Sequence, residues 1–202
     1  AMVTDLACCS QRGLGERFDG SIGSSSVLMP YGGKTSIAPA QSMAALIPVV
    51  DRETDTCSVM SFGFDPYLSS ENPYAAASSA VVTSAAKLVA AGCDPNGVYL
   101  TFQEYFEKLR HDPARWGKPF CALLGALDAP LGLGMAALGG KDSMSGSFNE
   151  INVPPTLVSF AIAPSSAEKV LTPEFKAAGH GVYWFAPEDT LEDTKRMFER
   201  VS

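Results

Sequence analysis

The sequence predicts an α/β (α+β) protein in which short buried strands are interspersed with helices rich in small residues. Apolar runs of about four to eight residues, bounded by turn residues, recur along the chain and are typical of buried strands. The clearest is residues 156–163, Thr-Leu-Val-Ser-Phe-Ala-Ile-Ala. Residues 74–91 are dominated by alanine, follow Pro73 and precede Gly92, which is the pattern of a capped helix. Small side chains along that helix indicate a closely packed neighbour.

Three strands are expected before this helix. Residues 1–25 are rich in glycine and serine and are interpreted as a connecting segment. Strands are then expected at residues 26–30, 44–50 and 57–64, with the charged stretch 51–55 as a turn between the last two.

The middle of the chain is expected to contain one more strand and a broken helix. Residues 98–102 are predicted to be a strand, and a helix is expected to begin at residues 103–109. Asp112-Pro113 should interrupt it, and helix is expected again at residues 119–129. One face of that last segment carries large apolar side chains, namely Phe120, Leu123, Leu124 and Leu127.

The C-terminal part shows a change in composition. Residues 165–179 are polar and resemble a linker, residues 182–185 are predicted to be a strand, and residues 190–201 a helix. One strand and one helix cannot bury their own apolar faces. We therefore expect a main domain over residues 26–164, and a linker and the first elements of a truncated second domain over residues 165–202.

Composition excludes several classes of function. A net charge of −7 argues against nucleic acid as a partner. No apolar run reaches the roughly 20 residues needed to cross a bilayer, so no membrane role is expected. The five cysteines form no Cys-x-x-Cys pair, and most are interpreted as small buried residues in a reducing cytoplasm. The Ala1-Met2 start is interpreted as foreign to the natural chain.

The most informative motif is residues 139–146, Gly-Gly-Lys-Asp-Ser-Met-Ser-Gly. Two glycines allow a backbone to approach a ligand closely. Lys141, Asp142 and Ser143 then supply a cation, an anion and a hydroxyl, a combination that suits a phosphate or a nucleotide. Because the apolar residues 136–138 precede it, we expect the motif to form a loop at the end of a strand.

Two common phosphate-binding loops fit this motif poorly. A Walker A loop needs glycine where Met135 stands and a hydroxyl where Asp142 stands. The Ser-Gly-Gly-x-Asp-Ser loop of ATP pyrophosphatases matches better, with Leu138 in place of its first serine. That loop normally opens a helix near the start of its domain, whereas this motif lies late in the chain and runs toward Pro154-Pro155. An ATP pyrophosphatase-type domain therefore stays as a weaker alternative.

Several sequence blocks, in order along nearly the whole chain, resemble phosphoribosylformylglycinamidine synthase (FGAM synthase, FGAR amidotransferase), a glutamine-dependent ligase of purine biosynthesis. The blocks are residues 4–14, 18–23, 29–34, 63–70, 102–106, 139–146 and 153–157. The family resembles a duplicated pair of synthetase modules joined to a glutaminase.

The resemblance places this chain in the second module. Residues 1–25 would come from the end of the preceding module, residues 26–164 would be an AIR-synthase-like N-terminal domain with a mixed sheet packed on helices, and residues 165–202 would open the C-terminal domain. The family's N-terminal domains pair through their sheets, with sites between modules. The implied partners are the remaining synthetase and glutaminase domains, and self-association of the fragment is expected to be possible.

The implied activity is that of a carbon–nitrogen ligase with glutamine as amido donor. ATP would activate the amide oxygen of formylglycinamide ribonucleotide, and ammonia from glutamine would displace the phosphate. The products are the amidine, ADP, phosphate and glutamate. ATP and Mg²⁺ are the implied cofactors, and the fragment alone is expected to be inactive.

The resemblance also implies site residues. In the related small-subunit form of the family, the corresponding loop reads Gly-Asn-x-Ser, in which glycine contacts nucleotide, asparagine contacts magnesium and serine contacts substrate. These positions fall on Gly140, Lys141 and Ser143, and Gly139 is expected to contact nucleotide as well. Protonated lysine cannot ligate a metal, so Lys141 is assigned to a phosphate of the substrate. Asp142 is a weak candidate metal ligand or a turn cap. No catalytic residue is assigned.

A purely structural role is the main alternative. Long-form relatives hold a metal-bound nucleotide with carboxylate and amide ligands, but the matching region here offers Gln41, Thr83 and Ala86. The chain would then complete a pseudo-dimer without binding a ligand. Among weaker polar candidates, Asp65 is expected to cap a turn, and Gln103-Glu104 at a strand end could line a site.

Overall fold

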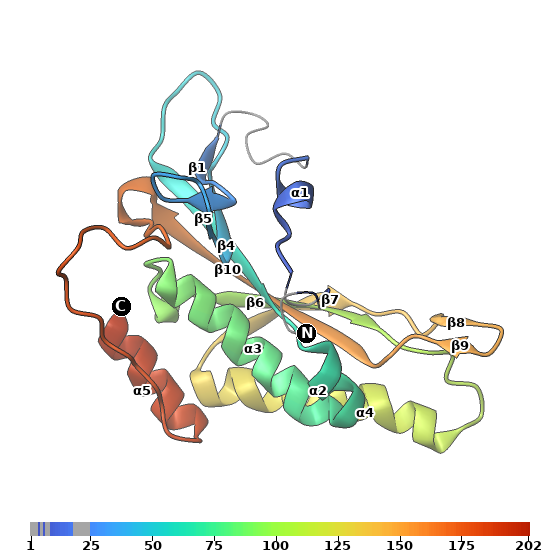
Figure 1. Cartoon of the computed structure of the whole chain (residues 1–202). Coiled ribbons are helices and arrows are strands. Elements are labelled where there is room, and N and C mark those ends of the chain that lie inside the picture. Colours follow the sequence, from blue (N-terminus) through green and yellow to red (C-terminus); the bar gives the residue numbers. More distant parts are fainter. Residues whose placement is uncertain (1–3, 5, 7–8, 18–24) are drawn as a thin grey trace.

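The computed structural model describes residues 4, 6, 9–17 and 25–202 (Figure 1). The predicted connecting segment 1–25 therefore lies partly outside the described residues. Its described part contains one short helix, α1 (Arg12–Gly15).

The fold is built on a mixed six-stranded sheet. Neighbouring strands are antiparallel except β6 and β7, which run parallel at one edge. In spatial order the strands are β1 (Ser26–Leu28), β4 (Ser42–Leu46), β5 (Thr56–Gly63), β10 (Thr156–Ser166), β6 (Tyr99–Tyr105) and β7 (Ala136–Lys141). Two small hairpins accompany it, formed by β2 (Tyr31–Gly32) with β3 (Ala38–Pro39) and by β8 (Ser147–Phe148) with β9 (Ile151–Asn152). The expected α/β class with a mixed sheet on helices is confirmed.

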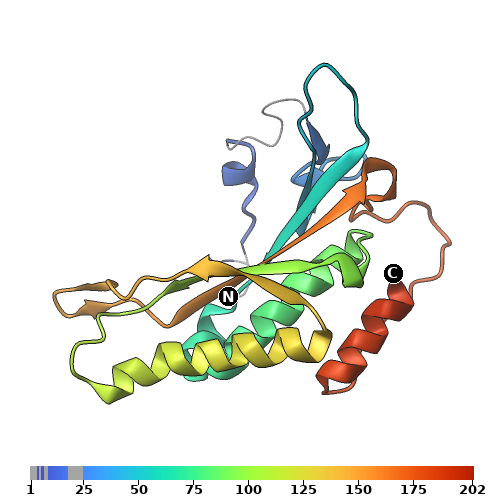
Figure 2. The same cartoon turned by 180° about the vertical axis from the view of Figure 1, so that it is seen from behind.

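Helices pack on one face of this sheet (Figures 1 and 2). They are α2 (Pro66–Glu71), α3 (Pro73–Ala90), α4 (Pro113–Leu133) and α5 (Leu191–Val201), with short 3-10 turns η3 (Pro95–Gly97) and η4 (Ala167–Lys169). The opposite face carries large side chains that are substantially exposed, among them Met43, Phe62, Tyr99 and Tyr105.

The α3–α4 contact is close because small residues face each other. Ala77 on α3 lies in one buried cluster with Ala122 and Ala126 on α4. A Cβ added at Gly125 would lie only 2.1 Å from the carbonyl oxygen of Tyr74. The close packing expected of the alanine-rich helix is thus confirmed, as is its boundary: Pro73 begins it, and Gly92 follows its end with a φ of +93°.

The predicted helix at residues 103–109 is wrong. Residues up to Tyr105 belong to β6, which pairs with β10 along its whole length. The predicted interruption of a helix at Asp112-Pro113 is also wrong, because no helix directly precedes these residues. Proline fits the first helical position, where its missing N–H is not needed, so Pro113 begins α4, and the Asp112 carboxylate accepts a hydrogen bond from the Ala114 N–H at 2.9 Å.

Helix α4 is longer than the predicted 119–129 segment and extends to Leu133. Its large apolar side chains do not form its packed face. The side chains that point outward share helical spacing and substantial exposure: Phe120, Leu123, Leu124, Leu127 and Leu131.

The C-terminal segment contains the predicted helix but not the predicted strand. Residues 182–185 form no strand, and their side chains are exposed. No neighbouring strand among the described residues offers them a ladder of hydrogen bonds. Helix α5 is capped by Thr190, whose hydroxyl accepts from the Asp193 N–H at 3.1 Å. It packs on the main core through Phe198.

Candidate functional site

The glycine motif begins inside a strand. Residues 139–141 are the end of β7, so the expectation that they form a loop beyond the strand end is wrong. Strand β7 runs parallel to β6, with Gly140 opposite Phe102 and Lys141 opposite Gln103. Both strands therefore end at the same edge of the sheet, which is where ligands commonly bind in α/β proteins.

The rest of the motif continues along β6. The Ser143 N–H donates to the Glu104 carbonyl at 3.2 Å, and the Phe106 N–H donates to the Ser143 carbonyl at 2.9 Å. This is the pattern of a parallel ladder, and it places Ser143 opposite Tyr105. The Gly146 N–H then donates to the Phe106 carbonyl at 2.9 Å. Residues 142–146 are thereby held against the end of β6.

The two glycines are required by the backbone itself. A Cβ at Gly140 would lie 2.4 Å from the Phe102 carbonyl oxygen, closer than real contacts allow. Gly139 has a φ of +132°, which other residues rarely adopt, and open space around it. The pairing register shifts just before Phe102, so both glycines accommodate an irregular strand pair. Thr101 supports it by donating its hydroxyl to the Gly139 carbonyl at 3.1 Å.

Strand alternation divides the polar side chains of the motif between two faces. Leu100 and Phe102 on β6, and Phe106 just after its end, face the helices. Gln103 and its partner Lys141 therefore share the open face of the sheet. Ser143, opposite Tyr105, lies on the same side, and its hydroxyl is 2.8 Å from that of Ser145. The structure thus brings Lys141 and Ser143 together.

Asp142 lies on the other face, together with Glu104. Glu104 is only 6 % exposed, and its Oε1 atom is buried with no hydrogen-bond partner in the described part of the chain. Burial, and secondarily the negative charge of Asp142, raises the pKa of Glu104 to about 7. From the sequence alone, Glu104 is only a weak candidate at a strand end. Its position in the apolar row between Phe102 and Phe106 was the signal that could have singled it out.

The acidic residues near the motif could supply only part of the coordination shell of a magnesium ion. Among the described residues, no group of three or more histidine, cysteine, aspartate or glutamate side chains could hold a metal. Asp142 and Glu104 provide two carboxylates. Mg²⁺ in nucleotide sites is commonly bound by one or two carboxylates, with water and phosphate oxygens completing its shell.

The other candidates have structural roles or none visible. Asp65 caps α2, as expected, by accepting hydrogen bonds from the N–H groups of Tyr67 at 2.9 Å and Leu68 at 3.0 Å. Cys57 and Cys93 are buried and free, as expected, whereas Cys121 is exposed.

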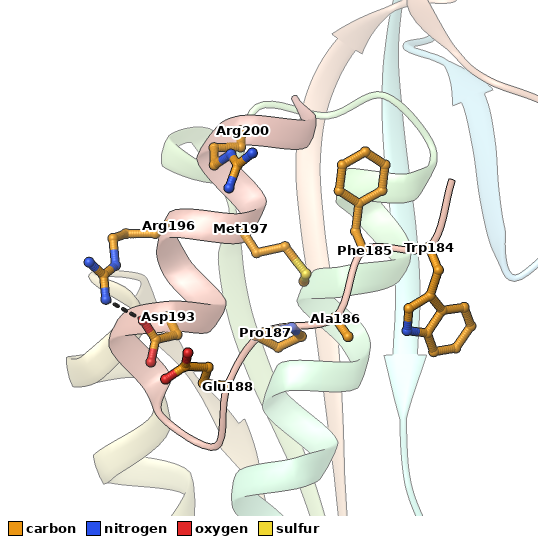
Figure 3. A pocket seen from close by; sticks show the side chains of 9 residues that line it. All are labelled: Trp184, Phe185, Ala186, Pro187, Glu188, Asp193, Arg196, Met197 and Arg200. Carbon is orange, nitrogen blue, oxygen red and sulfur yellow. Dashed lines mark hydrogen bonds and ion pairs between the residues drawn. The ribbon is translucent and has the colours of Figure 1, made fainter. Parts of the chain in front are cut away.

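A hollow of about 640 Å³ lies elsewhere, between residues 184–188 and helix α5 (Figure 3). Met197 extends toward the facing segment, but Arg196 points away from it and pairs with Asp193, and Trp184 points to the far side. Its polar side chains therefore do not converge on a common point. None of the site residues predicted from the sequence lines this hollow.

Comparison with known proteins gives likeness in structure alone. No protein-family model matches the sequence, and no curated protein matches it. A PurLQS structure from Thermotoga maritima is similar at a TM-score of 0.64 and 18% identity, over 82% of this chain and 25% of that chain. T. maritima PurL complexed with ADP is similar at a TM-score of 0.65 and 18% identity, over 86% of this chain and 27% of that chain. The same protein complexed with FGAR is similar at a TM-score of 0.62 and 19% identity, over 82% of this chain and 25% of that chain.

The fold is therefore similar to that of part of T. maritima PurL. One of these similar structures is phosphoribosylformylglycinamidine synthase II of T. maritima, matched at a TM-score of 0.58 and 19% identity. The chain spans about a quarter of the length of these structures. The fold expected from the sequence resemblance is confirmed. In the described residues, no helix is long and apolar enough to cross a membrane.

Proposed function

We propose that this chain is the N-terminal domain of the second synthetase module of an FGAM synthase, and that its glycine motif contacts the reactants. Two independent observations support the proposal. The sequence blocks resemble this enzyme in order, and the fold is similar to that of T. maritima PurL, which has been solved with ATP and with FGAR bound. Residues 26–164 would form this domain, and residues 165–202 would open the next.

The reaction would convert formylglycinamide ribonucleotide, ATP and ammonia released from glutamine into the amidine, ADP and phosphate. Such a phosphoryl transfer depends mainly on positioning and on neutralising charge. Lys141 would bind a phosphate and the Ser143 hydroxyl would bind substrate, while Gly139 and Gly140 would lie beside the nucleotide. When bound, Mg²⁺ would neutralise phosphate charge, with Asp142 as a ligand.

The observation that carries this assignment is the placement of Lys141 and Ser143. Both lie on the open face of the sheet, at the shared end of the parallel strands β6 and β7. The main chain of Ser143 is hydrogen-bonded to Glu104 of β6 and to Phe106, just after the end of that strand. A cation and a hydroxyl are thus presented side by side from a rigid backbone. That arrangement favours recognition of a phosphorylated ligand.

A structural role without ligand contacts is the second candidate, and the open face of the sheet favours it. Met43, Phe62, Tyr99 and Tyr105 leave this face substantially apolar, and such faces commonly mark protein interfaces. The chain would then pair with a second sheet, either that of the other module or that of another copy.

Kinetics of Lys141→Ala and Ser143→Ala in the complete enzyme separate the two roles. Ammonia-dependent ligation should fall by about 100-fold or more, the scale of one lost transition-state contact, while glutamine hydrolysis stays measurable. Lys169→Ala, at an exposed position outside the motif, serves as the control and should ligate normally. Near-wild-type ligation by both motif variants would favour the structural role.

A further inference from the structure

Helix α4 exposes its large side chains and buries its small ones, which is the reverse of an ordinary surface helix. Its buried residues are mainly small, as at Ala122, Ala126 and Ala129. Its outward side carries six large apolar side chains that are 39–70 % exposed, namely Trp116, Phe120, Leu123, Leu124, Leu127 and Leu131. Apolar groups gathered in this way on a surface mark a site of contact with another molecule or domain.

The six side chains form one continuous band, called the α4 stripe below. Successive residues of an α-helix are turned by about 100°, and at that angle all six lie within a sector of the helix about 100° wide. Asp128 is the one charged residue between Lys118 and the end of the helix, and it lies beside this sector. In both views α4 lies at the edge of the molecule, with no helix or strand of the described chain below it (Figures 1 and 2).

The spacing of the α4 stripe reads the same from both ends. The six residues are separated by 4, 3, 1, 3 and 4 positions. A twofold axis that passes between Leu123 and Leu124 therefore superimposes the stripe on itself. Two such helices packed antiparallel would pair Leu123 with Leu124, Phe120 with Leu127 and Trp116 with Leu131. An interface between two identical copies needs this self-complementarity, so the spacing favours a second copy as the partner.

The charge and the size of the stripe fit a weak dimer. An antiparallel arrangement places the N-terminus of each helix beside the C-terminus of the other, so that the helix dipoles attract each other. Side chains of this size have on the order of 200 Å² of surface, so the stripe offers roughly 600 Å² per copy. Two copies would bury about 1,200 Å², the lower limit of specific interfaces. We therefore expect reversible association.

We propose that two copies of this chain associate through the α4 stripe as an antiparallel, twofold-symmetric pair of helices. Trp116 and Phe120 would be its aromatic anchors, each present twice. Trp116 is already held in place, because its Nε1 donates a hydrogen bond to the Arg110 carbonyl at 3.0 Å. The stripe lies on the helical side of the sheet, so the pairing leaves the open face with Lys141 and Ser143 free. It does not depend on the proposed function.

Sedimentation equilibrium of the full 202-residue chain at increasing concentration tests the pairing. A reducing agent excludes disulfide-linked dimers through the exposed Cys121. The wild-type chain should shift from monomer to dimer. Phe120→Glu and Leu127→Lys should each weaken dimerisation by about 100-fold or more, because every dimer would bury two unpaired charges. Ala114→Glu, at an exposed position of the same helix outside the sector, should dimerise as the wild type does.

A mixture of the Phe120→Glu and Leu127→Lys chains tests the antiparallel register. Positions 120 and 127 would be opposite each other in this register, so the new carboxylate would meet the new ammonium group. The mixture should form a heterodimer within about tenfold of the wild-type affinity, since the paired charges compensate each other. A parallel pair would place position 120 opposite position 120 and would gain nothing from mixing. Recovery on mixing also shows that neither substitution unfolds the chain.

Three results would overturn the inference. A wild-type chain that stays monomeric at every concentration would leave the stripe to another domain or another protein. Wild-type association in both charged variants would assign the dimer to a different surface, such as the open face of the sheet. Dimerisation of the wild type without any recovery in the mixture would refute the antiparallel register.

Discussion

Replacing Gly125 by alanine should force helices α3 and α4 apart. The new Cβ would lie 2.1 Å from the Tyr74 carbonyl oxygen, 2.9 Å from its carbonyl carbon and 3.2 Å from the Ser78 nitrogen. All three are main-chain atoms of α3, so no side-chain rotation can relieve the overlap. Overpacking of this kind costs about 1–3 kcal/mol, and alanine returns up to about 1 kcal/mol through its better helix propensity. We expect a net loss of about 1–2 kcal/mol.

Gly117 provides the matched control, because it lies in the same helix and a Cβ there would meet no atom within 4 Å. Gly117→Ala should raise the free energy of unfolding by up to about 1 kcal/mol. Urea unfolding followed by circular dichroism measures both variants, and the dependence on urea concentration should stay the same. If Gly125→Ala proves as stable as Gly117→Ala, the close α3–α4 contact is refuted.

Three further predictions concern the sheet and the thiols. Gly140→Ala should loosen β7 from β6, because its Cβ would lie 2.4 Å from a main-chain oxygen; hydrogen exchange of the β7 amides should accelerate, and wild-type exchange would contradict this. Cys121 should react with Ellman's reagent at pH 8 before Cys57 and Cys93. Burial raises the pKa of both buried thiols, to about 11 for Cys93, so that little of either is thiolate at pH 8. Equal rates for the three would refute this burial. Met43→Glu should reduce any self-association through the open face of the sheet, measured by analytical ultracentrifugation, and unchanged association would exclude that face.

Local sequence signals were sufficient for most of the fold. The alanine-rich helix is confirmed with its proline start and its glycine end, because both are local backbone effects. Residues 103–105 were predicted to be helix and are strand, because pairing with β10 and β7 overrides their helix propensity. Residues 182–185 have strand propensity, but propensity alone forms no strand without a neighbour to pair with.

The candidate site was predictable only in part, because it depends on how two separate strands pair. The motif was visible as consecutive residues, but its division between two faces depends on the register of β7 against β6. That register places Lys141 and Ser143 on one side and Asp142 with Glu104 on the other. Glu104 belongs to a different segment of the chain, so spacing within the motif could not connect it to Asp142.

Under the proposed function, this chain would belong to a ligase that converts formylglycinamide ribonucleotide with ATP and ammonia. The most direct measurement is nucleotide product analysis by the complete protein that carries this sequence, with ammonia supplied so that no glutaminase is needed. We expect ADP and phosphate, formed in equal amounts with the amidine and only when the ribonucleotide is present. Release of AMP and pyrophosphate, or ADP formation that is independent of the ribonucleotide, would contradict it.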